Sequence, residues 1–266
     1  MPKARSMFQR IVKVSAIFCA ASLGFAVVGS ANENRSVRIA VEGAFPPFNY
    51  LDSAGQLQGF DVDIARALCD AAKFQCEFVI QEWTGMIPNL LDNRYDAIVS
   101  SMSMSAERRE KVAFSNKYYN SPSVFIAGKG LSVTDTTPEA LQSLRLGVTA
   151  ATSQETFIAA TYPKVSTTIF PASLDLYKGL ADGVVDIIIE DKLAIYDWLA
   201  NTKAGGCCEF KGEDITNTQF FGDGAGIAVK PSDPELLAQI NKALEQLQAG
   251  DTYDTINAKY FPFSIR

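Results

Sequence analysis

The sequence has 266 residues, 47% of them hydrophobic and 20% charged, which is enough apolar material for one large domain or two lobes and excludes a wholly disordered chain. Its 30 acidic and 24 basic residues give a formal charge of −6, and the basic residues are not clustered, so nucleic acid is not an expected partner. Because the sequence contains no histidine, Ser-His-Asp and Cys-His catalysis are excluded, and no metal site is expected.

The N-terminal segment has the pattern of a secretory signal peptide. Four basic residues precede an apolar run that ends at Val28, and small residues follow. The run is shorter than the roughly 20 residues that span a bilayer, so cleavage after Ser30 or Ala31 is predicted, with an uncleaved anchoring helix as the alternative. A large residue precedes Cys19, so no lipid anchor is expected. Removing residues 1–31 takes away four basic and no acidic residues, which changes the formal charge from −6 to −10.

Strand and helix patterns alternate in the first part of the mature chain. Apolar residues alternate through 37–41, which predicts a strand, and a helix is expected within 59–69 with Asp61 as its N-cap. A second strand is expected at 78–80, and a short helix from Thr84.

A serine-rich segment, Ser100–Arg109, follows a buried strand expected at 95–100. Ser105 is the expected N-cap of a helix, which places Arg108 at the third helical position. Hydroxyls, backbone N–H groups and a guanidinium would converge there, and a guanidinium can hold a carboxylate through two parallel charge-assisted hydrogen bonds. The segment therefore predicts a carboxylate receptor. The alternative is that Arg108 is a solvated helix residue beside a turn.

The second part of the chain continues the alternation. Strands are expected at 123–127, 146–149, 184–190 and 226–230, and helices from Thr137–Pro138, from about residue 153 and from Asp233–Pro234. The last helix carries Leu237, Ile240, Leu244 and Leu247 on one face. This pattern predicts an α/β fold with parallel sheets.

Three strand-to-helix junctions can line one cleft, because open α/β sheets place ligands beyond the carboxyl ends of their strands. They are residues 42–48, the serine-rich segment and residues 149–154, and a fourth strand ends by delivering Asp191. The ligand that these groups describe has a carboxylate for Arg108 and an amino group for Asp191. For Asp191, simple capping of the next helix is the alternative.

Four cysteines remain in the mature chain, and an exported protein can oxidise them. Cys69 ends an expected helix and Cys76 starts the next strand, so a disulfide between them is predicted. Cys207 and Cys208 are adjacent in a Gly-rich loop, where a vicinal disulfide, two free thiols and an intermolecular bridge all remain open.

Taken together, the segments EGAFPPFNY, GFDVDIARALC, SSMSMSAERR, GVTAATSQETF and IIIED, in this order, resemble the periplasmic solute-binding proteins (family 3) that feed polar amino acids to ABC importers. The similarity is greatest to the lysine/arginine/ornithine, histidine and opine binders. It implies the type II periplasmic-binding-protein fold, with two α/β lobes joined by two crossing strands. Lobe 1 would hold residues 36–120 and 223–266, and lobe 2 residues 121–222.

The resemblance also implies a function. The protein would be the periplasmic substrate-binding component of an ABC importer. It would enclose a cationic L-amino acid (arginine, ornithine, lysine or histidine) between its lobes and deliver it to a membrane permease. A monomer without a cofactor and without enzymatic activity is expected.

Matching positions to this family assigns residues to the α-carboxylate and the α-amino group, which all amino acid ligands share. Arg108 and Ser103 match the grip on the ligand carboxylate, with Ser153 contributing from the opposite lobe. Asp191 and Ser101 match the contacts to the α-amino group.

Other positions match the contacts to the ligand side chain. Phe45 and Trp83 match the residues that sandwich it, with ordinary core packing as the alternative, and Ser100 and Glu42 match the end that meets its distal group. For Glu42 the alternative is a solvated loop carboxylate. Thr149 stands where a larger apolar residue is common in the family.

Two departures bear on the choice of ligand. Glu42 and Phe45 stand where the lysine and histidine binders usually have Asp and Tyr, which could favour arginine or ornithine, and the pair Glu-Gly also occurs in opine binders. The alternatives are therefore an opine-binding protein, or an exported cyclohexadienyl dehydratase on the same scaffold with Glu42 as general acid. A sensor domain acting through a separate membrane partner is a third alternative.

Overall fold

The structure is a computed structural model that describes residues 35–266. The predicted signal peptide, residues 1–31, and Cys19 within it lie outside the described residues. Between residues 35 and 266, no helix is both long and apolar enough to cross a membrane.

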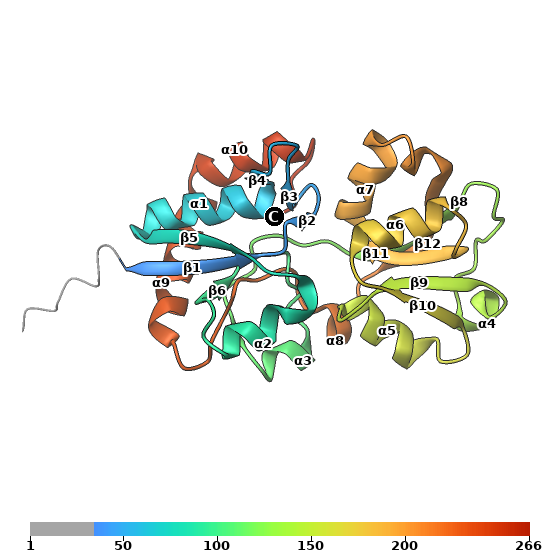
Figure 1. Ribbon diagram of the computed structural model, residues 1–266, viewed down its shortest axis with the longest axis horizontal. Coiled ribbons are helices and arrows are strands. Elements are labelled where there is room, and N and C mark those ends of the chain that lie inside the picture. The colour runs from blue at the N-terminus through green and yellow to red at the C-terminus, as the bar shows by residue number, and fades with distance from the viewer. Residues whose placement is uncertain (1–34) are drawn as a thin grey trace, which may run out of the picture. The chain divides into compact units, whose positions relative to one another are not determined.

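The first of two large sheets has five strands in the order β5-β1-β6-β13-β7 (Figure 1). These strands are β1 (Ser36–Val41), β5 (Gln75–Ile80), β6 (Ala97–Ile98), β7 (Ala113–Phe114) and β13 (Ala228–Val229). β1, β5 and β6 run parallel, whereas β13 is antiparallel to both of its neighbours. The prediction of parallel sheets holds for β1, β5 and β6 and is wrong at β13, because β13 belongs to the chain's return from the second sheet and enters in the opposite direction.

The second sheet repeats this arrangement in the order β10-β9-β11-β8-β12. Its strands are β8 (Ser123–Gly128), β9 (Arg145–Thr149), β10 (Ser166–Phe170), β11 (Ile187–Asp191) and β12 (Cys208–Ile215). β9, β10 and β11 are parallel, and β8 is antiparallel to β11 and β12. Each sheet is thus a parallel core with a reversed strand where the chain crosses between the two. The predicted two-sheet α/β class is confirmed.

Helices cover both faces of each sheet (Figure 1). Those around the first sheet are α1 (Phe60–Ala72), α2 (Met86–Leu91), α3 (Ala106–Arg109), α9 (Pro234–Ala249) and α10 (Asp251–Tyr260). Those around the second are α4 (Pro138–Leu141), α5 (Ser153–Thr161), α6 (Ser173–Ala181) and α7 (Lys192–Asn201). The short elements are β2 (Ala44–Phe45), β3 (Asn49–Leu51), β4 (Leu57–Gln58), α8 (Thr218–Phe221) and the 3₁₀ turns η1 (Trp83–Gly85) and η2 (Gly205–Cys207).

Three of the predicted helix caps are present. The side chains of Ser105, Thr137 and Asp233 each accept a hydrogen bond from the backbone N–H three residues later, a contact typically worth about 1 kcal/mol. The prediction for Asp61 is wrong. Gly59 occupies the N-cap position of α1 with no side-chain cap, and Asp61 lies in the first turn, where its carboxylate serves a different purpose.

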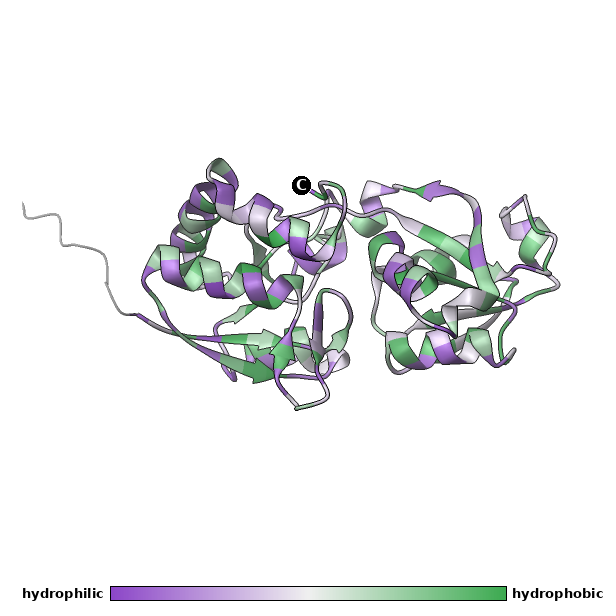
Figure 2. Ribbon diagram, turned by 90° about the horizontal axis from the view of Figure 1, so that it is seen from above, coloured by the Kyte–Doolittle hydropathy of each residue, from purple (hydrophilic) through white to green (hydrophobic). Residues whose placement is uncertain are grey.

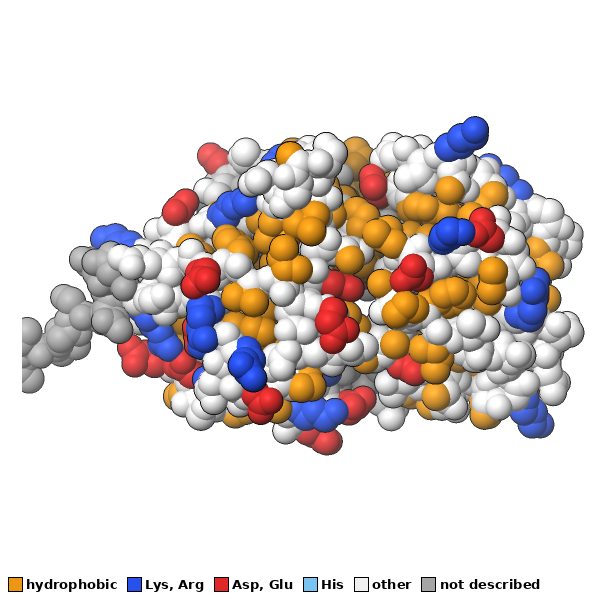
Figure 3. Space-filling view, in the orientation of Figure 1, with side chains coloured by type: hydrophobic (Ala, Val, Ile, Leu, Met, Phe, Trp, Pro, Cys, Tyr) orange, Lys and Arg blue, Asp and Glu red, His pale blue; other side chains and the backbone are white. Residues whose placement is uncertain are grey.

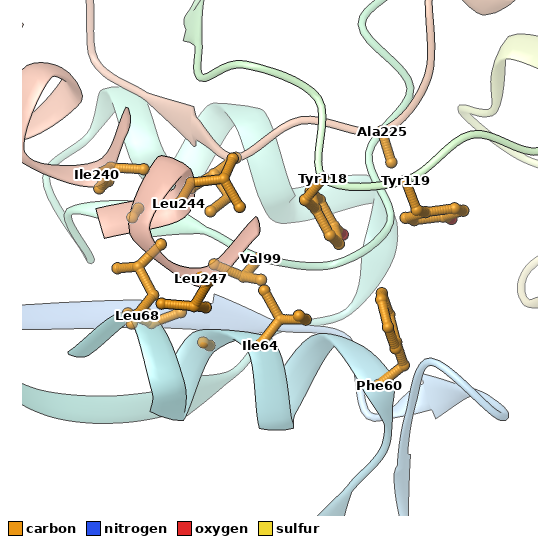
Figure 4. Packing of buried hydrophobic residues seen from close by; sticks show 14 of the residues in the cluster. Phe60, Ile64, Leu68, Val99, Tyr118, Tyr119, Ala225, Ile240, Leu244 and Leu247 are labelled. Atoms are coloured by element: carbon orange, nitrogen blue, oxygen red, sulfur yellow. The ribbon is translucent and has the colours of Figure 1, made fainter. Parts of the chain in front are cut away.

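The core of the first sheet lies between its strands and helices α1 and α9 (Figure 4). Ile64 and Leu68 lie one turn apart on α1, and Leu244 and Leu247 lie one turn apart on α9, so each pair occupies one face of its helix. All four are buried, and each contributes about 2 kcal/mol of hydrophobic free energy. This packing fixes the strands whose carboxyl ends form the site.

In the second sheet, successive residues of β11 pack on opposite faces. Ile187 and Ile189 join the cluster that contains Phe157 of α5, whereas Ile188 joins the cluster that contains Leu176 of α6. Because both faces are covered, every position of the run Ile187–Ile189 is apolar. The strands of the first sheet, drawn beside the grey trace in Figure 2, are likewise coloured largely as hydrophobic.

Two chain segments cross between the sheets and pair with each other. The backbone N–H of Tyr118 donates to the carbonyl of Ala225 (3.0 Å), and the N–H of Ala225 donates to the carbonyl of Tyr119 (3.0 Å). The lobe bounds predicted at 120/121 and 222/223 stay a prediction.

The part of the chain that the structure describes contains two disulfides. Cys69 of α1 is joined to Cys76 of β5, as predicted. Cys207 and Cys208 form a vicinal disulfide between η2 and β12, which selects one of the three alternatives that the sequence left open.

Candidate functional site

A single cavity brings together nine of the ten predicted ligand-binding residues. They are Glu42, Phe45, Trp83, Ser100, Ser101, Ser103, Arg108, Thr149 and Asp191. The tenth, Ser153, lines an adjoining open groove that shares Trp83 and Arg108 with the cavity, and its buried hydroxyl has no hydrogen-bond partner among the described residues. β1, β9 and β11 end at this cavity, which is where α/β sheets place ligands.

Arg108 is held by helix α3 with its guanidinium in the cavity wall. Its backbone N–H donates to the Ser105 hydroxyl (3.3 Å), and its guanidinium donates to the carbonyls of Ser103 and Ala151 (3.1 Å each). The guanidinium carbon also lies 5.1 Å from the centre of the Trp83 ring. Burial lowers the pKa of Arg108 to about 10, so the group stays cationic at neutral pH. The remaining N–H groups of the fork can bind an anion.

The two aromatic residues have different surroundings. Trp83 donates from its indole nitrogen to the Ala151 carbonyl (3.0 Å), the same oxygen that Arg108 contacts. Phe45 is stacked on Phe48, with ring centroids 5.7 Å apart, and packs against the core of the first sheet. Phe45 therefore has the core contacts of the alternative interpretation and also lines the cavity.

Asp61 is the buried anchor of the serine-rich segment. Its carboxylate accepts hydrogen bonds from the Asn49 amide (2.7 Å), the Ser101 hydroxyl (2.8 Å) and the Tyr118 hydroxyl (2.7 Å). The backbone N–H of Ser101 in turn donates to the Tyr118 hydroxyl (2.9 Å). Ser101 has a φ of 52°, a left-handed conformation that is uncommon outside glycine, and this network holds it there.

Asp191 has the cap contacts of the alternative interpretation. Its Oδ1 atom accepts from the backbone N–H groups of Leu193 (2.9 Å) and Ala194 (3.2 Å) and from the Ser121 hydroxyl (2.7 Å). Burial raises its pKa to about 6, although these three bonds favour the ionised form. All three bonds reach one oxygen, so capping and a ligand contact through Oδ2 are compatible.

Four further residues line the cavity. Thr152 and Gln154 lie in the junction at 149–154 that was expected at the cleft, although neither was given a role, and Ser173 and Glu190 were missed by the sequence reasoning. Glu190 is the most consequential, because it is a carboxylate that is only 4% exposed. A signal was present in the sequence, since an acidic residue at the end of the apolar run Ile187–Ile189 has no reason to be there for packing alone.

Burial makes the cavity's carboxyls weak acids. Burial, with repulsion from Asp61 and Glu82, raises the pKa of Glu42 to about 7. Burial, with repulsion from Asp191 and Glu42, raises the pKa of Glu190 to about 8. By itself the cavity therefore disfavours negative charge, and a bound cation would favour the ionised carboxylates.

We expect the stability of the ligand-free protein to fall as pH rises from 5 to 8. The folded state binds more protons than the unfolded chain in this range, because Glu42 and Glu190 are weaker acids when folded. The free energy of unfolding should decrease by about 1–3 kcal/mol, measured by urea denaturation. The chain has no histidine to titrate in this window.

The matched control for this measurement is Glu190→Gln, whose unfolding free energy should vary less with pH between 5 and 8. Carboxyls with lowered pKa, such as Asp96 beside Arg38, contribute stability that is lost only at lower pH and do not mask the effect. A stability that rises through this window in the ligand-free protein would contradict the expectation.

Among residues 35–266, no group of three or more acidic or cysteine side chains is placed to hold a metal ion. The cavity instead offers one guanidinium, three carboxyls, two aromatic rings and several hydroxyls. This set can bind a small zwitterion with an extra positive charge.

Comparison with known proteins places these features in context. Residues 37–263 match the family model of the bacterial extracellular solute-binding proteins, family 3. The chain is 38% identical to the L-arginine-binding protein of Pseudomonas aeruginosa, over 87% of this chain and 90% of that protein. It is 33% identical to the lysine/arginine/ornithine-binding periplasmic protein of Escherichia coli, over 86% and 89%. The solved structure of an ancestral arginine-binding protein bound to arginine superposes with a TM-score of 0.78 at 29% identity, over 86% of this chain and all of that one.

Proposed function

Because this chain belongs to the bacterial extracellular solute-binding proteins, family 3, we propose that it is a periplasmic protein that binds a cationic L-amino acid, arginine above the others, and delivers it to a membrane ABC permease. The names of its relatives support this, since one is an L-arginine-binding protein and another binds lysine, arginine and ornithine. A catalytic role is not part of the proposal.

The observation that carries the proposal is the distribution of charge in the cavity. Arg108 is the one basic residue among those lining it, and Glu42, Glu190 and Asp191 are acidic. A ligand with one carboxylate and two cationic groups would pair its carboxylate with Arg108 and its two cations with two of the three acidic groups, and that is the charge pattern of a basic amino acid. The acidic mature chain would also attract it from solution, and Figure 3 shows acidic side chains near the middle of one face.

We assign the ligand's main-chain end to Arg108, Ser103 and Ser153 for its carboxylate, and to Asp191 and Ser101 for its amino group. The buried Ser153 hydroxyl has no hydrogen-bond partner among the described residues, which supports a contact to the ligand carboxylate. The free oxygen of Asp191 supports the amino contact.

We assign the ligand's side chain to the other wall of the cavity. Phe45 and Trp83 would hold its alkyl part, and Glu42 and Ser100 its distal group. The Ser100 hydroxyl already accepts from the backbone N–H of Glu42 (3.1 Å), which ties these two residues together. Thr149, whose hydroxyl lies 3.4 Å from that of Ser173, would border the distal group.

Binding would act through lobe closure. The lobes proposed are residues 36–120 with 223–266, and residues 121–222. Arg108 and Trp83 contact the Ala151 carbonyl across these lobes, so a ligand that touches both sides stabilises the closed form selectively. The permease would then recognise the closed form.

A second candidate ligand is an opine, an amino acid that carries an additional acidic group. The open groove beside Trp83 and Arg108 supports it, because this groove adjoins the cavity and its lining includes Lys111, which would have to exchange its ion pair with Glu107 (2.7 Å) for one with that group. An opine would place its basic side chain in the cavity and its additional group in the groove.

The test is a thermal-shift panel on protein stripped of ligand by unfolding and refolding with its disulfides intact. The panel holds arginine, ornithine, lysine, histidine, glutamine, glutamate, octopine and prephenate. We expect arginine at saturation to raise the melting temperature by roughly 5–10 °C, with little response to glutamate. A larger shift with octopine would favour the opine. A shift or turnover confined to prephenate would overturn the proposal in favour of an enzyme.

A further inference from the structure

Glu190 has an unusual position in the second sheet. It is the penultimate residue of β11, only 4% of its surface is exposed, and it lines the same cavity as Glu42. Its Oε1 atom accepts from the backbone N–H of Asp191 (2.8 Å). Its Oε2 atom is buried, and no donor among the described residues forms a hydrogen bond with it. A buried carboxylate oxygen without a hydrogen-bond donor destabilises the folded state, so the presence of a glutamate at this position needs an explanation.

The neighbours of Glu190 do not neutralise it. The hydroxyls of Ser173 and Tyr177 lie near its carboxyl group, but Oε2 and the Tyr177 hydroxyl are both buried without a hydrogen-bond partner among the described residues. The guanidinium of Arg108 donates instead to the carbonyls of Ser103 and Ala151. The remaining charged neighbours are Asp191 and Glu42, which repel it.

Glu42 and Glu190 approach the cavity from different sheets. Glu42 follows β1 of the first sheet, and Glu190 belongs to β11 of the second. A planar guanidinium has five N–H donors spread around its plane and needs acceptors on more than one side. An ammonium concentrates its charge and its three N–H donors at one nitrogen, so its acceptors must gather around a single point. Two carboxylates from opposite sides therefore suit a guanidinium best.

We propose that Glu190 is a specificity-determining residue that binds the distal guanidinium of the ligand together with Glu42, so that the side chain's charge is held from both lobes. This rests on the proposed function and goes beyond it by naming the second acceptor and the group selected. Wild-type protein should bind arginine at least 100-fold more tightly than citrulline, which has the same shape and no charge. Lysine should fall between them.

The experiment is isothermal titration of arginine, lysine and citrulline into wild-type protein and Glu190→Gln, each stripped of ligand. In Glu190→Gln we expect arginine affinity to fall at least 30-fold and citrulline affinity to change less than threefold. Glu139→Gln, which removes an exposed carboxylate from α4, is the matched control for net charge and should behave as wild type.

A second readout is proton release. Arginine binding should release protons at pH 7 in the wild type, detected as heats that depend on the buffer's ionisation enthalpy, because the bound cation ionises carboxyls that are partly protonated in the empty cavity. The release should be smaller in Glu190→Gln. If that variant does not fold, Glu190→Asp serves instead. Its shorter side chain moves the carboxylate away from the ligand but keeps the charge, so it should lower arginine affinity more than citrulline affinity.

The outcomes separate the two proposals. If wild-type protein binds none of the basic amino acids, the proposed function fails and this inference with it. If the wild type binds arginine and Glu190→Gln binds it equally well, this inference alone fails. It also fails if arginine and citrulline lose affinity equally, because Glu190 would then support the fold of the cavity and not select the ligand.

Discussion

Replacing Arg108 by alanine is expected to abolish measurable arginine binding while the protein stays folded. The loss should be at least about 100-fold in affinity, because the ligand carboxylate would be buried without its charge-assisted hydrogen bonds, each worth roughly 1.5–3 kcal/mol. The same change removes the donors to the carbonyls of Ser103 and Ala151 and the contact with the Trp83 ring. Titration calorimetry measures the affinity, and circular dichroism checks the fold.

Two variants control this experiment. Arg108→Lys keeps the charge but loses the planar fork, so its affinity should lie between those of the wild type and Arg108→Ala. Arg109→Ala removes the neighbouring guanidinium, which contacts the Met104 carbonyl (3.0 Å) and does not line the cavity, so binding should be retained. A folded Arg108→Ala protein with near-normal affinity would contradict the assignment of the carboxylate end.

Replacing Asp61 by alanine is expected to lower the free energy of unfolding by about 3–5 kcal/mol. Asp61 is fully buried, and its removal would leave the Asn49 amide and the hydroxyls of Ser101 and Tyr118 without their acceptor. Each buried donor left unpaired costs about 1–3 kcal/mol, partly offset by relaxation of the hydroxyls. Urea denaturation at neutral pH measures the change.

The same variant should also weaken ligand binding, because Ser101 would lose the contacts that hold its left-handed backbone in the cavity wall. Asp70→Ala is the matched control, since Asp70 lies on the same helix and is exposed, and its effect should stay below about 0.5 kcal/mol. A loss below 1 kcal/mol in Asp61→Ala would mean that this network contributes little to the fold.

Features that depend on neighbouring residues were predicted well from the sequence. The caps at Ser105, Thr137 and Asp233 need only the three residues that follow each of them, and the Cys69–Cys76 disulfide joins a helix to the next strand. The two-sheet α/β class was also predicted, because alternating apolar patterns report directly on which elements form.

The errors and omissions have a common physical origin. Asp61 was expected to cap its own helix, but its partners come from β3, the serine-rich segment and the crossing segment, 12 to 57 residues away in sequence. The reversed strands β8 and β13 follow from the direction in which the chain re-enters each sheet. No local pattern records such contacts.

The sequence by itself determined which elements form and which residues lie at the ends of the strands, since both follow from local propensity and side-chain periodicity. Only the tertiary structure decided which of those ends meet. Glu42 follows a strand of the first sheet, and Glu190 lies in a strand of the second. They share a cavity because two chain crossings bring the carboxyl ends of these strands together. Burial there raises the pKa of both carboxyls, and that change in chemistry depends on the folded surroundings of each residue.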